Sequence, residues 1–169
     1  GQVPLGIKVD ILDTATTGTD RGSWSGQVGF EVLPVNDPAK LTVQNVSGDE
    51  DGSISLGGLG ASLIDTDGSE QIVGLQIRGV PDGFTLSAPA VNNGGGVWQV
   101  PVGTDFTRLA LIPPADFSGT GDLTLSAFTL DKGLTLPLET SAGFTVTVNP
   151  VGDVIIADIE SKASGAEGD

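Results

Sequence analysis

Short runs of Val, Ile and Leu alternate with polar residues along most of this chain, and Gly, Asp, Asn and Pro separate the runs. A period of two is typical of strands with one buried face, and the separating residues are typical of turns. The pattern predicts strands near residues 40–47, 53–63, 71–79, 83–88, 97–101, 107–112 and 122–130, and a further strand after residue 134. We therefore expect an all-β fold, an antiparallel β-sandwich of seven to eight strands.

The same alternation predicts which side chains form the core. One face of each predicted strand is apolar, and that face should turn inward. The residues expected inside are Leu41, Val43, Ile54, Leu56, Ile72, Leu75, Ile77, Leu109, Leu111, Leu123, Leu125, Phe144 and Val146. Most of the aromatic residues Trp24, Trp98, Phe84, Phe117 and Phe144 have buried Val and Leu neighbours in the pattern, so we expect them in the core and not on a sugar-stacking surface.

An internal repeat sets the expected domain boundaries. The strings GFEV at 29–32 and PVND at 34–37 recur as GFTV at 143–146 and PVGD at 150–153, which is 114 to 116 residues later. Such a period fits tandem sandwich domains of about 100 residues. We expect residues 1–36 to hold the last strands of one unit, with a turn at 19–22, residues 37–152 to form a complete unit, and residues 153–169 to begin the next. An alternative is that the two end segments pair as one split domain.

Charge and missing residue types exclude several functions. The chain has 22 Asp and Glu against 7 Lys and Arg, a formal charge of -15, which repels nucleic acid and anionic membrane surfaces. Without His or Cys it has no imidazole base, thiol nucleophile, disulfide or thiolate site, which leaves a carboxylate-pair hydrolase as the one conceivable enzyme. Because the Asp and Glu pairs fall on turns at domain ends and not in a pocket, we expect no enzyme. We also expect no membrane insertion, because no long apolar run is present. So acidic a chain needs carboxylates that are dispersed, screened by salt or neutralised by bound cations.

The acidic residues fall into two expected groups at opposite ends of the unit. If the first strand leaves the 35–38 linker and the second returns to it, the linker meets the 65–70 turn. Calcium takes six to eight oxygens, and this meeting supplies them from Asn36, Asp37, Asp65, Asp67 and Glu70. The second group, beside the outgoing linker, is Glu50, Asp51, Asp116 and Asp153. The simpler alternatives are an Asx turn at 65–68 and a solvated acidic loop at 49–51. We expect Asp20 and Asp131 to form turns and to bind no metal.

Five strings together carry a family resemblance: VNDP at 35–38, GDEDGSISL at 48–56, DTDGSE at 65–70, PPADFSGTGDLTL at 113–125 and GFTVTVNPVGD at 143–153. In this order they resemble the immunoglobulin-like, cadherin-like repeats of giant type I-secreted, RTX-type adhesins of Gram-negative bacteria. The resemblance implies an extracellular, monomeric extender module, stiffened by Ca²⁺, that projects ligand-binding domains for adhesion and biofilm formation. Its expected partners are adjacent repeats of the same chain, and a glycan or peptide would be bound through neighbouring domains.

Two departures from the family pattern bear on the metal sites. The string PVGD at 150–153 lacks the Asn that precedes Asp37, which weakens the outgoing site, and the Gly-rich run at 57–62 lacks the Asp of the calcium-binding nonapeptide, so no β-roll is expected. The alternative function is a module that itself binds a sugar or peptide. Its recognition loop would be the Asn- and Gly-rich segment 92–96, which equally suits a plain connector.

Overall fold

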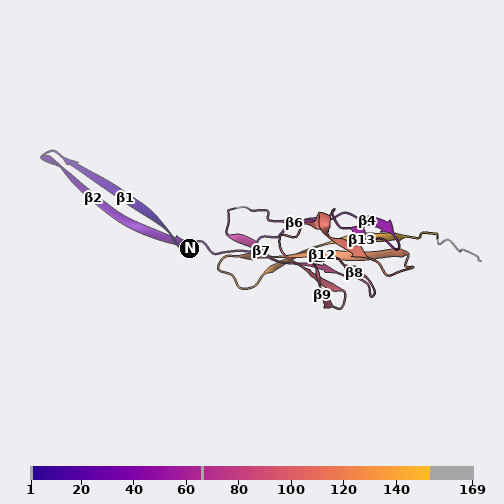
Figure 1. Ribbon diagram of the computed structural model, residues 1–169. Coiled ribbons are helices and arrows are strands. Elements are labelled where there is room, and N and C mark those ends of the chain that lie inside the picture. The colour runs from indigo at the N-terminus through magenta and orange to yellow at the C-terminus, as the bar shows by residue number, and fades with distance from the viewer. Residues whose placement is uncertain (1, 66, 153–169) are drawn as a thin grey trace, which may run out of the picture.

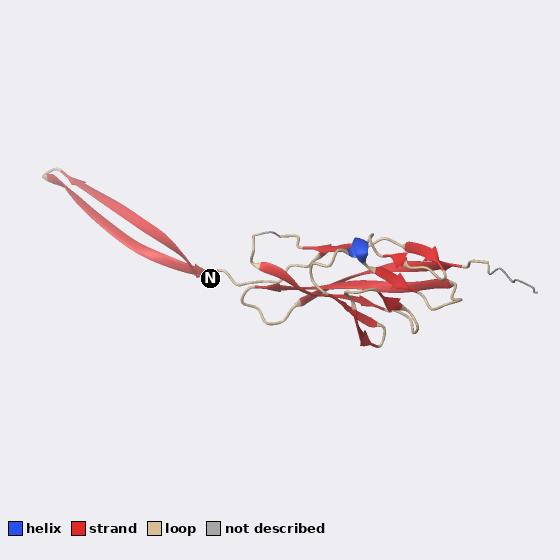
Figure 2. Ribbon diagram, in the orientation of Figure 1, coloured by secondary structure: helices blue, strands red, loops and turns tan. Residues whose placement is uncertain are grey.

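A computed structural model describes residues 2–65 and 67–152 of the chain, and its regular elements are strands apart from one 3₁₀ turn (Figure 2). The expected all-β fold is confirmed. The strands are β1 (Gln2–Ala15), β2 (Gly18–Glu31), β3 (Lys40–Thr42), β4 (Val46–Asp49), β5 (Ile54–Ser55), β6 (Gly60–Ser62), β7 (Glu70–Arg78), β8 (Thr85–Leu86), β9 (Val91–Gly94), β10 (Val97–Val100), β11 (Ala110–Ile112), β12 (Gly119–Asp131) and β13 (Leu138–Asn149), with the 3₁₀ turn at Phe106–Arg108.

Residues 40–149 form a sandwich of packed sheets. One sheet has six strands in the order β4-β13-β12-β7-β10-β9, and smaller sheets are formed by β5-β11-β8 and β3-β6. All these pairs are antiparallel except β13 and β4, which run parallel. The longest strands of this sheet, β12 and β13, run along the body (Figure 1), so their ends mark the two ends of the unit.

The core lies between the six-stranded sheet and the smaller sheets. Ten of the thirteen expected core residues are buried, and the other three, Leu41, Val43 and Ile72, are partly buried and pack against them. Phe84, Trp98 and Phe144 are buried as expected, and Phe117 packs edge-on against Phe84 with ring centroids 4.9 Å apart. Full burial of a Leu or Ile side chain contributes roughly 1.5–3 kcal/mol, so this apolar layer is the main stabilising feature of the fold.

Two expected strands are each broken in the middle. The strand expected at 40–47 divides into β3 and β4, and at the break the Asn45 side chain accepts a hydrogen bond of 2.9 Å from the Thr145 N–H of β13. The strand expected at 53–63 divides into β5 and β6 at the glycines before Leu59. A Cβ on Gly58 would lie 2.9 Å from the amide oxygen and 3.0 Å from the Cβ of Gln44, so the two chain segments cross closely at this break. A strand over 91–94 was not expected, and β9 occupies it.

The N-terminal strands β1 and β2 form a long hairpin that stands clear of the sandwich (Figure 1). Their register is continuous from Gln2–Glu31 to Ala15–Gly18, so the turn is at residues 16–17 and not at 19–22 as expected. Asp20 therefore lies within β2, opposite Asp13, and is not a turn residue. Trp24 was expected in a core and is 58% exposed, because nothing in the described part of the chain covers this hairpin.

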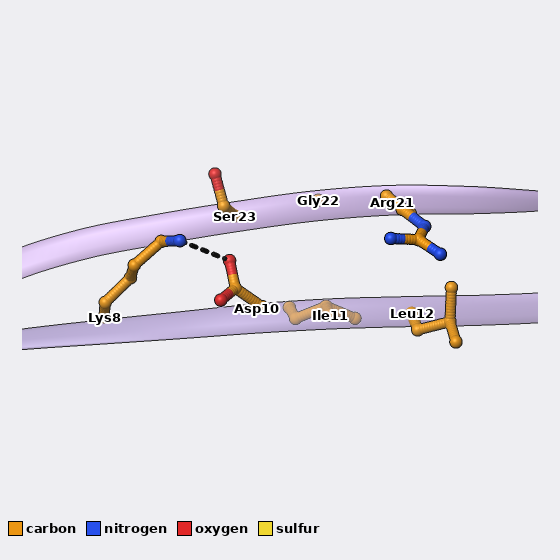
Figure 3. Close-up of a pocket in the computed structure, with 7 residues that line it drawn as sticks. All are labelled: Lys8, Asp10, Ile11, Leu12, Arg21, Gly22 and Ser23. Carbon is orange, nitrogen blue, oxygen red and sulfur yellow. Dashed lines mark ion pairs between the residues drawn. The ribbon is translucent and has the colours of Figure 1, made fainter.

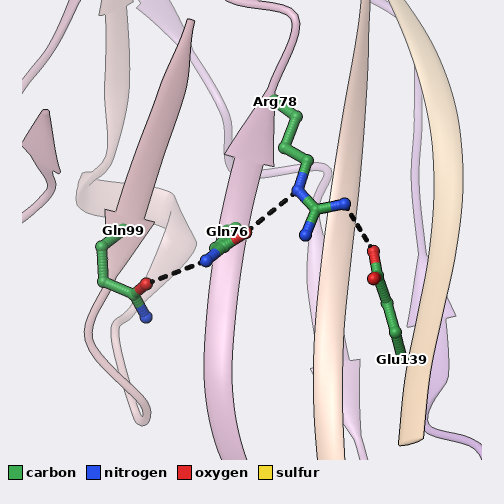
Figure 4. A network of polar contacts seen from close by, with 4 residues as sticks. All are labelled: Gln76, Arg78, Gln99 and Glu139. Atoms are coloured by element: carbon green, nitrogen blue, oxygen red, sulfur yellow. Dashed lines mark hydrogen bonds and ion pairs between the residues drawn. The ribbon is translucent and has the colours of Figure 1, made fainter. Parts of the chain in front are cut away.

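The outer face of the six-stranded sheet is tied together by polar side chains (Figure 4). Arg78 of β7 donates to Gln76 at 3.0 Å and to Glu139 of β13 at 2.7 Å, while Gln76 donates to Gln99 of β10 at 3.3 Å. Arg78 thereby crosses β12, where its guanidinium lies 5.7 Å from the Phe128 ring centroid. Such half-exposed ion pairs contribute little stability, about 0–1 kcal/mol, and this face is a solvated one.

Candidate functional site

The incoming linker is held to the end of the sandwich by its two polar residues. The Asp37 N–H donates to Glu70 Oε1 at 2.6 Å, and the Asp37 carbonyl accepts from Thr129 Oγ1 at 2.6 Å. Asn36 uses both ends of its amide, because Nδ2 donates to the Leu136 carbonyl at 2.8 Å and Oδ1 accepts from the Asp131 N–H at 2.6 Å. The linker is thus clamped between the start of β7 and the end of β12.

Glu70 is the central residue of this clamp. As the first residue of β7 it lies on the core side of the sheet and is only 7% exposed. One carboxylate oxygen accepts from Asp37, whereas the other, Oε2, is buried and has no hydrogen-bond partner. An ionised carboxylate is rarely buried unless it is paired or coordinates a metal, because the lost hydration is costly. An ionised Glu70 therefore has one oxygen whose charge no donor among the described residues compensates.

Asp131 lies beside Glu70 and was not expected in this site. The two residues are directly opposite in the antiparallel β12–β7 pair, so their side chains share one face with Cβ atoms about 4.5–5.5 Å apart. Like charges at such a position are destabilising. The sequence contained a signal, since Asp131 directly follows the strand expected at 122–130, but only the strand register brings it to Glu70.

Asp65 and Asp67 form a tight turn just before Glu70. The Asp67 N–H donates to Asp65 Oδ1 at 3.0 Å, and Asp67 Oδ1 accepts from both the N–H and the hydroxyl of Ser69, at 2.8 and 2.6 Å. The hydrogen bond from the Ser69 hydroxyl, helped by the one from its N–H, lowers the pKa of Asp67 below its ordinary value. These are the bonds of an Asx turn, which forms without an ion. Both carboxylates are exposed, with Asp67 on the rim of a hollow of about 350 Å³ that the linker and Asp131 also line.

The incoming end fits a calcium ion in its donor chemistry. Calcium prefers carboxylate and carbonyl oxygens, and Glu70 Oε2 is such an oxygen without a donor. Asn36 Oδ1 has one hydrogen bond and keeps a second lone pair. In the described ranges no three carboxylates gather closely enough to form a ready-made metal cage. A full calcium shell at this end would therefore need side chains such as Asp37, Asp65 or Asp67 to turn toward Glu70.

The outgoing end has a simpler arrangement. Glu50 Oε1 accepts from the Val151 N–H at 2.7 Å, and the Glu50 N–H donates to the Asn149 carbonyl at 2.9 Å. Asp51 and Asp116 are exposed and have the positive φ values of 63° and 58° that mark turn residues. The register places the Asp116 turn at this same end, because β12 starts at Gly119 opposite Val148. Asp153 lies outside the described residues.

Two other regions, a hollow on the hairpin and the segment 92–96, lie outside the linker ends. A hollow of about 460 Å³ on the hairpin (Figure 3) contains a well-exposed 3.2 Å ion pair between Lys8 and Asp10; its lining residues are Lys8, Asp10, Ile11, Leu12, Arg21, Gly22 and Ser23. The segment 92–96, expected to be a loop, forms the end of β9 and the tight turn into β10; there Gly96 has φ 74°, and a Cβ would lie 2.8 Å from the Val80 carbonyl. Gly96 is thus required by close backbone packing, which suits a connector.

Comparison with known proteins found no protein-family model and no curated protein that matches the chain. None of the described elements is a helix with the length and apolar character needed to cross a membrane.

Proposed function

We propose that residues 37–152 form a structural extender unit whose incoming joint is stiffened by bound calcium. In this proposal the unit belongs to a tandem array in a bacterial cell-surface adhesin, exported by type I secretion, that projects ligand-binding domains for adhesion and biofilm formation. The observation that carries the proposal is the buried, unpartnered Oε2 of Glu70, whose other oxygen holds the linker at Asp37.

Electrostatics explain why a cation would matter at this joint. Glu70 and Asp131 are opposite each other, and Asp37 belongs to the linker that covers them. Two carboxylates about 4–5 Å apart repel by about 1 kcal/mol in a water-like dielectric and by more when partly buried. This repulsion acts to open the clamp that the Asn36 and Asp37 hydrogen bonds close. One divalent cation reverses its sign.

The proposed ligands are the side chains of Glu70, Asp131 and Asp37, with Asn36 Oδ1 and the Asp65–Asp67 turn completing the oxygen shell. Bound calcium supplies two positive charges that neutralise the buried carboxylate. Extracellular calcium modules bind with Kd values of roughly 10⁻⁴–10⁻³ M, so such a site fills outside the cell and stays empty in the cytosol. The joint would then be pliant before export and stiff afterwards.

The test is thermal melting of the wild type and Glu70→Gln in calcium and in chelator. Gln keeps the shape and an oxygen for the Asp37 N–H but removes the buried charge. At calcium 100-fold above Kd, wild type should gain about 2.7 kcal/mol, a rise of roughly 10 °C in Tm. Glu70→Gln should gain nothing in calcium, and in chelator it should equal or exceed wild type in Tm, because an uncompensated buried charge is gone.

Asp82→Asn is the matched control, since it removes one carboxylate charge from an exposed turn. This variant should keep the full calcium response. Equal calcium responses in wild type and Glu70→Gln would overturn the assignment of Glu70. A wild-type Tm that is unchanged by chelator would overturn the calcium proposal itself.

A further inference from the structure

One face of the β1–β2 hairpin is apolar from the Val3–Phe30 pair to the Ile11–Gly22 pair, and the Asp13–Asp20 pair lies beyond it, near the turn. Odd-numbered residues of β1 lie opposite even-numbered residues of β2, and directly opposite residues share a face. We call this face the apolar ribbon face, and its side chains are between 39% and 60% exposed. Its members are Val3, Leu5, Ile7, Val9, Ile11, Trp24, Val28 and Phe30.

The other face of the hairpin is mostly polar. It carries Lys8, Asp10, Arg21 and Ser23 (Figure 3), together with Leu12 opposite Arg21. A two-stranded hairpin by itself is marginally stable in water, and three or more strands with a covered apolar face are needed for independent stability. The amphipathic pattern is therefore that of a sheet fragment with one face meant for a core.

The chain contains a second hairpin, β12–β13, that shows how such a face is used. Val3 is paired with Phe30 in the first hairpin, and Leu123 is paired with Phe144 in the second, within the repeated strings GFEV and GFTV. Leu123 and Leu125 are 1% and 0% exposed, whereas the matching Val3 and Leu5 are 44% and 56% exposed. The same positions of the repeat are thus buried in one copy and open in the other.

The strands that bury the second hairpin come before it in the chain. Beside it in the sheet is β7, and its apolar side chains share one core with those of β5, β8 and β11. We infer that the apolar ribbon face is covered in the same way, by a half-sandwich formed by the polypeptide that precedes residue 1, with the strand pattern of residues 38–118. A second copy of this chain is the poorer occupant, because two chains of charge -15 repel each other.

This inference rests on the repeat and the exposed face, and not on the calcium proposal. The test compares the 169-residue chain with the natural polypeptide extended upstream by about 80 residues, close to one repeat less its final hairpin. In each chain, acrylamide quenching of tryptophan fluorescence is measured for the wild type and for Trp24→Phe. The difference between the two gives the quenching of Trp24 alone, without the contribution of the buried Trp98. Trp24 should be quenched like free tryptophan in the shorter chain and at least about fivefold less in the extended one.

Two leucines of β1 provide matched variants for melting of the extended chain. Leu5 and Leu12 are 56% and 57% exposed here but lie on opposite faces of the hairpin. Leu5→Asn should lower the Tm of the upstream unit by roughly 10 °C, as for a polar group placed in a core, and Leu12→Asn should leave it unchanged.

Three results would overturn the inference. The first is equal quenching of Trp24 in both chains, and the second is equal melting of the Leu5 and Leu12 variants. The third is a decrease in acrylamide quenching of Trp24 as the concentration of the 169-residue chain rises. That result would mean that a second copy of the chain covers the apolar ribbon face.

Discussion

The two ends of the sandwich hold their linkers by the same hydrogen bond. At the incoming end Glu70 Oε1 accepts from the Asp37 N–H at 2.6 Å, and at the outgoing end Glu50 Oε1 accepts from the Val151 N–H at 2.7 Å. The difference is burial. Glu70 is nearly inaccessible and has an oxygen without a partner, whereas Glu50 is half-buried on a turn after the edge strand β4.

Burial of the second carboxylate oxygen is what separates a candidate metal site from a simple linker clamp. A carboxylate that accepts a backbone N–H is a common way to fix a chain segment and needs no ion. A second oxygen that faces water, as the half-exposed Glu50 allows, is solvated at no cost. A second oxygen that is buried without a donor is costly, about 1–3 kcal/mol or more for a charged group. The incoming end is therefore the stronger candidate for calcium.

Among single substitutions at the two ends, the largest effect on calcium binding is expected for Asp131. Asp131→Asn should weaken calcium binding about tenfold, or about 1.4 kcal/mol, because one of two opposed carboxylates is lost. In chelator the same variant should be more stable than wild type by about 0.5–1 kcal/mol, since the repulsion with Glu70 disappears. Calorimetric titration and urea unfolding measure the two quantities.

Asp51→Asn at the outgoing end is the control, because Asp51 is exposed and lies in the turn that follows β4, outside the strand pairs. It should change the calcium affinity by less than about twofold. Equal losses for Asp131→Asn and Asp51→Asn would mean that the two ends bind calcium alike.

A smaller effect is expected in the titration of Asp67. Its pKa is lowered by the hydrogen bonds from Ser69, and the pKa of Asp105 is lowered by the same pair of bonds from Thr107. Because both folded pKa values lie below the ordinary value of 3.8, the stabilisation is complete above that pH and is lost as the pH falls below it. Ser69→Ala should raise the pKa of Asp67 toward 3.8.

Asp105 is an internal control for calcium, since it caps the 3₁₀ turn, away from both linkers. Calcium should lower the pKa of Asp67 further and leave the pKa of Asp105 unchanged. NMR titration of the carboxyl carbons, with calcium and with chelator, measures both pKa values. An identical Asp67 curve in calcium and in chelator would remove Asp67 from the ligand set.

Alternation along the chain was sufficient to predict the fold class and the core. Residues such as Leu75 and Ile77 are buried because the period of two places them on one face of β7, a local property of the sequence. The strand breaks were not predictable in this way. The break between β3 and β4 depends on a hydrogen bond between Asn45 and Thr145, residues 100 positions apart, and no local pattern contains it.

The site was predicted less completely than the core. The expected path of the first two strands placed the 36–37 linker near Glu70, and Asp37 does contact Glu70. The feature that distinguishes Glu70 from the other acidic residues at this end is its burial, which the sequence pattern did not predict. Asp131 was assigned to a turn because D-x-G sequences form turns without metals. Its position opposite Glu70 depends on the β12–β7 register, which includes an irregularity between Phe128 and Thr129. A one-residue slip there would turn Asp131 to the other face.

The most direct test of the proposal that calcium stiffens the joint is a distance measurement between the hairpin and the sandwich. The chain has no cysteine, so Ser23→Cys and Ser141→Cys, both at exposed positions, can carry spin labels for pulsed electron resonance. We expect a narrow distance distribution in millimolar calcium, a broad one in chelator, and a broad one for Glu70→Gln even with calcium. Equal widths in calcium and chelator for the wild-type joint would contradict the proposal that calcium stiffens it.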